Sequence, residues 1–215
     1  MPSPPNSPLK IATLEESDID EFVRMQIAAF PSQTARILYA PSAETAEIFR
    51  LNQRKMMKED PSVYFQKVIE PDTGDIMACA RWKIYPVPRD ECEIQSKKPA
   101  TSDSGPKKWQ DRAKEAFHMR LHDYMRDVMG TQPLYHMLMT DPRFSRRGAA
   151  YTLLRWGISE ADRTQLPIYL ESSNMARSLY EKCGFRVLEC FAMDLGKFGG
   201  AGIETVTIMV RWPRS

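Results

Sequence analysis

A short segment rich in arginine and small residues, residues 141–150, has the composition of an anion-binding turn. It reads Asp-Pro-Arg-Phe-Ser-Arg-Arg-Gly-Ala-Ala and joins a predicted strand to a predicted helix. The N–H groups at a helix start point outward and the helix dipole is positive there, which suits a phosphate. Small residues at 148–150 would let it approach the backbone, and Arg146 and Arg147 would add mobile positive charge. The alternative is an ordinary tight turn with two solvated arginines.

A second segment, residues 171–185, favours the phosphate-binding interpretation over the ordinary turn. It reads Glu-Ser-Ser-Asn-Met-Ala-Arg-Ser-Leu-Tyr-Glu-Lys-Cys-Gly-Phe and runs from a strand end through a short helix to another strand. Together the two segments resemble the GNAT acetyltransferase superfamily, whose signature is strand-Pro-x-x-[Gln/Arg]-x-x-Gly-x-[Gly/Ala], followed by Leu-Tyr-x-x-x-Gly-Phe. The resemblance covers about residues 134–185, and its sequence context is similar to a fungal branch of the superfamily. The matching positions are Pro142, Gly148, Ala150, Leu179, Tyr180, Gly184 and Phe185.

The resemblance implies that acetyl-CoA is the cosubstrate and that no metal takes part. Its pyrophosphate would lie on the turn at residues 146–151, and its pantetheine arm along the backbone of residues 138–140. Two positions depart from the family pattern: Ser145 stands at the Gln/Arg position, and Ser173 stands where Asn is frequent, with Asn174 one residue later. The implied cofactor-binding residues are Leu138, Met139, Thr140, Arg146, Arg147, Gly148, Ala149, Ala150, Tyr151, Ser173 and Asn174.

The resemblance also implies direct attack of a free amine on the thioester in a ternary complex. Tyr180 matches the tyrosine that often protonates the leaving thiolate in the family; the alternative is a tyrosine that fills the core. Glu171 is the leading candidate for the base, because it stands at the C-terminal end of a predicted strand, where ligands gather in open α/β sheets. A surface or capping acid is the alternative. His136 is the second candidate for the base, and a packed core histidine is its alternative reading.

Hydrophobic periodicity predicts the elements that position these residues. The order of strands and helices, with the family resemblance, indicates an α/β GNAT fold: a mixed central β-sheet of about seven strands flanked by helices, with splayed central strands. Residues 134–170 are expected to form a right-handed βαβ crossover. Strands are predicted at residues 9–13, 63–70, 76–85, 134–140, 168–171, 185–195 and 203–212, and helices at 17–30, 43–58, 109–129, 147–163 and 174–182.

The chain of 215 residues is expected to form a flexible tail, residues 1–8, and one domain, residues 9–215. A loop and helix at about residues 86–130 would be an insertion. The Pro/Ser-rich loop at residues 86–107, the first helices and the Gly-rich turn at residues 198–202 are expected to border the acceptor's entrance.

Composition limits the classes of function. A net charge of +2 gives no reason to expect nucleic-acid binding. No apolar run reaches the ~18 residues of a membrane span, and four scattered cysteines indicate neither zinc ligation nor a disulfide framework, which favours the cytoplasm. The expected partner is a small-molecule amine, and a homodimer stays open. The alternatives are a protein or peptide acetyltransferase and a non-catalytic acyl-CoA-binding protein.

Overall fold

The computed structural model describes residues 9–29, 42–88, 90, 108–130, 138–140 and 142–214. The expected tail at residues 1–8, His136 and most of the loop at residues 86–107 therefore lie outside the described residues. The chain divides into two units. Unit 1 draws on residues 1–31, 41–84 and 135–164, and unit 2 on residues 32–40, 85–134 and 165–215. Each unit is described by itself.

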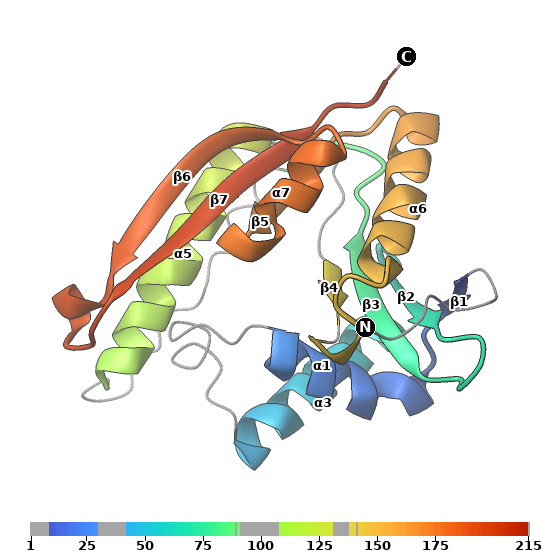
Figure 1. Cartoon of the computed structure of the whole chain (residues 1–215). Coiled ribbons are helices and arrows are strands. Elements are labelled where there is room, and N and C mark those ends of the chain that lie inside the picture. The colour runs from blue at the N-terminus through green and yellow to red at the C-terminus, as the bar shows by residue number, and fades with distance from the viewer. Residues whose placement is uncertain are drawn as a thin grey trace. The chain divides into compact units, whose positions relative to one another are not determined.

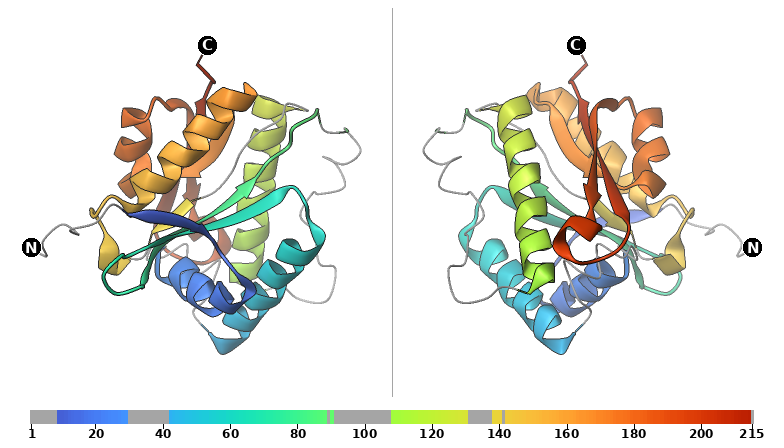
Figure 2. Two further views of the ribbon diagram at one scale, coloured as in Figure 1. Left: turned by 90° about the vertical axis from the view of Figure 1, so that its right-hand side faces the viewer. Right: turned by 90° about the vertical axis from the view of Figure 1, so that its left-hand side faces the viewer.

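Unit 1 is an antiparallel sheet with helices on both faces (Figures 1 and 2). Alternate residues of β3 point to opposite faces: Cys79 joins a core with residues of α1, whereas Trp82 packs under α6 against Gly157. The strand order is β1-β2-β3-β4. Its elements are β1 (Lys10–Thr13), η1 (Glu16–Asp18), α1 (Ile19–Ala29), α3 (Ala43–Glu59), β2 (Val63–Ile69), β3 (Ile76–Lys83), β4 (Leu138–Thr140), η2 (Pro142–Phe144) and α6 (Ala149–Thr164).

Unit 2 is a three-stranded antiparallel sheet with the order β5-β7-β6. α5 covers one face of it and α7 lies on the other, as both figures show. The face toward α5 is the main core, where Phe117 and Tyr124 of α5 meet Tyr169, Phe191 and Ile208 of the strands. The elements are α5 (Trp109–Met129), β5 (Ile168–Ser172), α7 (Asn174–Lys182), β6 (Arg186–Asp194), η3 (Leu195–Phe198) and β7 (Ile203–Arg211).

The α/β fold with about seven strands is as expected, but the arrangement of the strands is not. The described strands form a sheet of four and a sheet of three instead of one mixed sheet, and every described pairing is antiparallel. β4 pairs at Leu138–Thr140 with β3, and β5 pairs with β7. The two strands of the expected βαβ crossover therefore belong to different sheets, because each finds its described hydrogen-bond partner in an antiparallel neighbour.

Candidate functional site

The turn before α6 has an unusual backbone. Arg146 has φ 62° and Gly148 has φ 87°, so left-handed residues stand on both sides of Arg147. Glycine adopts this conformation without cost, whereas arginine does not. These two residues delay the start of the helix to Ala149, two residues later than the sequence predicts. Around Gly148 there is open space, since an added Cβ would meet only Leu9 Cδ1, at 3.9 Å.

The backbone N–H groups of the first turn of α6 are available to an anion. The amide of Thr152 donates to the Gly148 carbonyl at 2.9 Å. Within the described part of the chain, the amides of Ala149, Ala150 and Tyr151 have no acceptor. Gly148 and Tyr151 are exposed at this helix start, where the helix dipole adds positive potential. Alternating left-handed backbone and aligned amides are the features that let a turn bind phosphate.

The two arginines of the turn differ. Arg146 is exposed. Arg147 is not the mobile charge that the sequence suggested: its Nη2 lies 2.6 Å from Oε2 of Glu70, and its side chain is 20% exposed. Its guanidinium also lies 5.5 Å from the centre of the Phe144 ring. The correction has a simple cause, because a carboxylate that is almost fully buried requires a cation beside it.

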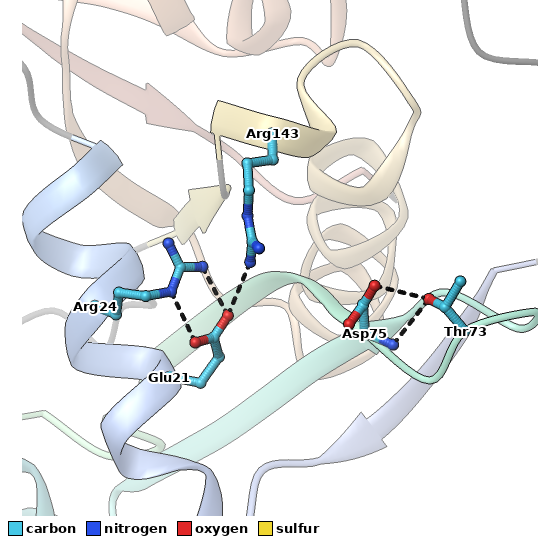
Figure 3. Close-up of polar contacts among 5 residues, drawn as sticks. All are labelled: Glu21, Arg24, Thr73, Asp75 and Arg143. Carbon is cyan, nitrogen blue, oxygen red and sulfur yellow. Dashed lines mark hydrogen bonds and ion pairs between the residues drawn. The ribbon is translucent and has the colours of Figure 1, made fainter.

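A second ion pair ties the segment before the turn to α1. Arg143 of η2 lies 3.1 Å from Oε1 of Glu21, and Arg24 donates to both oxygens of the same carboxylate at 2.7 Å (Figure 3). Because these three side chains are partly exposed, the pair contributes little stability on its own. Together with the Arg147–Glu70 pair, it anchors the segments on both sides of Phe144 within unit 1.

In unit 2, α7 carries three of the expected residues. Ser173 is the N-cap residue of α7 and Asn174 its first residue, and both are exposed. Tyr180 is 7% exposed and meets Phe185 edge to face, with ring centroids 5.5 Å apart. Burial, followed by the nearby Cys183, raises the pKa of Tyr180 to about 12. Burial also raises the pKa of the Cys183 thiol.

Glu171 and Tyr180 lie on opposite faces of the unit 2 sheet. Glu171 is opposite Ile208 in the β5–β7 register, and Ile208 belongs to the core under α5. It shares that face with Tyr169, whose pKa is raised by burial and by the Glu171 carboxylate. Tyr180 stands on α7, which covers the other face. The structure thus does not bring the expected acid and base to one side of this sheet.

Sequence reasoning missed two polar contacts. One is the Arg147–Glu70 ion pair. In the other, the Tyr124 hydroxyl donates to Glu189 at 2.5 Å and accepts from Arg120 at 2.9 Å. The spacing of Arg120 and Tyr124, four residues apart on one helix, was a signal for part of the second contact. Among the described residues, no group of three or more His, Cys, Asp or Glu side chains could hold a metal ion.

Known proteins resemble this chain in sequence over one region and in fold over almost all of it. Residues 102–191 match the family model described as acetyltransferase (GNAT) domain, and no curated protein sequence gives a significant match. An arylalkylamine N-acetyltransferase 2 from Aedes aegypti has a TM-score of 0.67 at 14% identity, covering 97% of this chain and 100% of its own.

Two further solved structures have the same fold. One, titled histone acetyltransferase HPA2 and related acetyltransferase, from Corynebacterium glutamicum, has a TM-score of 0.60 at 18% identity and covers 97% of this chain and 98% of its own. The apo form of an agmatine N-acetyltransferase mutant has a TM-score of 0.64 at 11% identity, covering 96% and 100%. At these identities the likeness shows the fold alone, and the resemblance to a fungal branch stays a prediction. Residues 102–191 thus match a GNAT acetyltransferase domain, and the chain has the fold of solved structures named as acetyltransferases, which together support an N-acetyltransferase enzyme.

Proposed function

We propose that the protein transfers an acetyl group from acetyl-CoA to a primary amine of a small molecule. The observation that carries the proposal is the start of α6, where the amides of Ala149, Ala150 and Tyr151 have no acceptor among the described residues and the backbone at Gly148 is open to solvent. A pyrophosphate fits this turn, because it needs several N–H donors and a close approach to the main chain. Arg146 would add its charge from outside the turn.

The reaction is direct transfer between the two bound substrates. The ammonium group loses a proton to a base, the free nitrogen attacks the thioester carbonyl, the new C–N bond forms, and the C–S bond breaks to release the thiolate, which then takes up a proton. Backbone groups of β4, at Leu138–Thr140, are proposed to hold the pantetheine arm. Ser173 and Asn174 are proposed to contribute from the start of α7. Bound in one complex, the reactants avoid the entropic cost of a bimolecular encounter.

Tyr180 is the proposed proton donor. Its raised pKa keeps the hydroxyl protonated at neutral pH but also makes it a weaker acid. Burial disfavours a charged thiolate at this part of unit 2 as well, since it raises the pKa of the Cys183 thiol. Glu171 is the first candidate for the base; because it lies on the face of the sheet opposite Tyr180, it would have to receive the proton through an intervening water. His136 stays the second candidate.

The acceptor class rests on likeness of fold. Two of the matched structures are named for arylalkylamine and agmatine acetyltransferases, which favours a small amine. The matched structure named as a histone acetyltransferase and related acetyltransferase favours the second candidate, a protein or peptide acceptor. Among the described residues no helix is long and apolar enough to cross a membrane.

Thiol release from acetyl-CoA across a panel of amines tests the proposal. The panel holds arylalkylamines, agmatine, polyamines and lysine-containing peptides, with the corresponding alcohols as controls that lack the nucleophile. We expect thiol release that depends on a small amine. When both substrates are varied, the double-reciprocal plots should intersect, as a ternary complex requires. Release with peptides alone would favour the second candidate. Binding of acetyl-CoA without release with any amine would indicate a non-catalytic acyl-CoA-binding protein.

A further inference from the structure

Glu70 is a buried carboxylate at the end of β2, and its backbone closes the β2–β3 hairpin. Its N–H donates to the Asp75 carbonyl at 2.8 Å, and its carbonyl accepts from the Gly74 N–H at 2.9 Å. Its side chain is only 5% exposed. A charged side chain that is buried next to a rigid hairpin has a fixed position, so it can fix the position of whatever binds it.

Arg147 is the group that binds it. Their closest atoms are 2.6 Å apart. The contact is an ion pair rather than an aligned hydrogen bond, since neither Glu70 Oε2 nor Arg147 Nε has a hydrogen-bond partner within the described residues. Neither charge is well solvated, so each is stabilised mainly by the other. The pair joins the hairpin to the centre of the turn before α6.

The pair explains how an arginine is kept in a left-handed conformation. Arg146 and Gly148 both have positive φ, and Arg147 stands between them. Such a backbone at a residue other than glycine costs free energy and persists only where its surroundings determine it. A side chain held at residue 147 restrains the main chain on both of its sides. The restraint reaches the amides at the start of α6 directly, because Gly148 precedes Ala149.

We propose that Glu70 is a positioning residue for the phosphate-binding turn: through Arg147 it holds the backbone amides in the orientation that receives the pyrophosphate of the acyl donor. This inference rests on the proposed function. Arg147 then holds the backbone of the turn in place, and Arg146 is the arginine of the turn that faces the ligand. Removing the Glu70 charge weakens binding of the donor although it removes a negative charge from the neighbourhood of an anion.

The sign of that effect separates two roles for Arg147. If Arg147 contacts the phosphate itself, Glu70 competes for it, and Glu70→Gln tightens acetyl-CoA binding. If Arg147 instead holds the backbone of the turn in place, Glu70→Gln loosens the turn and raises the acetyl-CoA Kd by roughly 10-fold. This is the order of magnitude expected for loss of one charged contact. Glutamine keeps the size of the side chain, so the change isolates the charge.

The test is a double-mutant cycle on acetyl-CoA affinity, measured by calorimetry with Glu70→Gln, Arg147→Met and the double variant. We expect each single variant to weaken binding and the double variant to be no weaker than either, because both act on one contact. Pantetheine, which lacks the phosphates, should bind wild type and all variants with the same Kd, which a general loss of structure would not allow. Glu70→Asp, which keeps the charge but withdraws it by one methylene, is judged by the same criteria should Glu70→Gln be unstable.

Asp75→Asn is the matched control. It removes a carboxylate from the same hairpin, but Asp75 is exposed and accepts from Thr73 Oγ1 at 2.9 Å, a contact within the hairpin itself (Figure 3). Its acetyl-CoA Kd should equal that of wild type. Unchanged or tighter binding by Glu70→Gln, or additive effects in the cycle, would overturn the assignment of Glu70 alone. A wild-type protein that does not bind acetyl-CoA would overturn the proposed function and this assignment with it.

Discussion

A Cβ atom on Gly157 would lie 2.3 Å from the Trp82 ring, so α6 meets β3 at a point where only glycine fits. Trp82 is itself fixed, since it is 2% exposed and its Nε1 donates to Gln66 at 2.9 Å. The site that the start of α6 provides thus depends on a close contact two turns further along the same helix.

Gly157→Ala should therefore destabilise the protein. In an exposed helix the change would add about 1 kcal/mol of stability, but here overpacking of about 1–3 kcal/mol opposes it. We expect a lower midpoint of urea unfolding. Ser159→Ala, at an exposed position of α6, is the control and should raise the midpoint slightly. A Gly157→Ala protein as stable as the control would show that Trp82 can move aside.

A pair of substitutions at Gly148 tests the anion site. Asparagine and aspartate have nearly the same shape, and both tolerate a left-handed backbone such as the φ of 87° at this position. Only aspartate places a negative charge where we propose the pyrophosphate to lie. Gly148→Asp should raise the acetyl-CoA Kd at least about 10-fold relative to Gly148→Asn, a difference of about 1.4 kcal/mol. Equal affinities by calorimetry would remove the pyrophosphate from this turn.

Local signals explain which parts of the fold could be predicted. The periodic apolar positions of residues 109–129 gave α5 with the bounds that the structure has, and the turn residues 71–74 gave the β2–β3 hairpin. Sheet membership depends on distant pairing, which no local pattern encodes, so one mixed sheet was predicted where the described strands form two. The first helix was expected to begin at residue 17, but Ser17 lies inside η1, where Glu15 and Asp18 form a capping box, and α1 begins at Ile19.

The candidate site was predicted in the same uneven way. The turn at residues 146–150 was found because its small residues follow one another in the sequence. The left-handed Arg146 carries no such signal, and the partner of Arg147 could not be inferred because Glu70 belongs to a hairpin far away in the sequence. The sequence also did not predict that Glu171 and Tyr180 lie on opposite faces of the unit 2 sheet. The direction of Glu171 is set by the alternation of side chains along β5, whereas Tyr180 belongs to α7.

Tyr180 should make the protein sensitive to alkali. Its folded-state pKa of about 12 lies above its ordinary value of 10.0. The neutral form is therefore favoured in the folded state, and this contribution of about 3 kcal/mol is present below pH 10 and is lost as pH rises toward 12. Tyr180→Phe should flatten the decline of stability over that window. Urea unfolding at several alkaline pH values measures it, and an equal decline in both proteins would contradict the burial of the hydroxyl.

Tyr180→Phe should also lower turnover. The phenyl ring keeps the contact with Phe185, so the fold and the acetyl-CoA Kd should be preserved. If the hydroxyl protonates the leaving thiolate, kcat falls by roughly 10- to 10⁴-fold. Pre-steady-state measurements must first show that chemistry limits the rate. A variant with full turnover under that condition would leave Tyr180 a packing residue.

Glu171→Gln tests the proposed base through pH. A base is needed most where the acceptor is an ammonium ion, and it becomes dispensable as the amine loses its proton unaided. The ratio of wild-type to variant kcat/KM should therefore be large at neutral pH and shrink as pH approaches the pKa of the acceptor.

Glu189→Gln is the matched control, because Glu189 on β6 and Glu171 on β5 are both opposite Ile208 in the register. Glutamine at residue 189 can still accept from Tyr124. The ratio of wild-type to Glu189→Gln kcat/KM should therefore stay constant across the pH range. A Glu171→Gln deficit that stays constant across the pH range would mean that the carboxylate supports binding or packing beside Tyr169 rather than proton transfer.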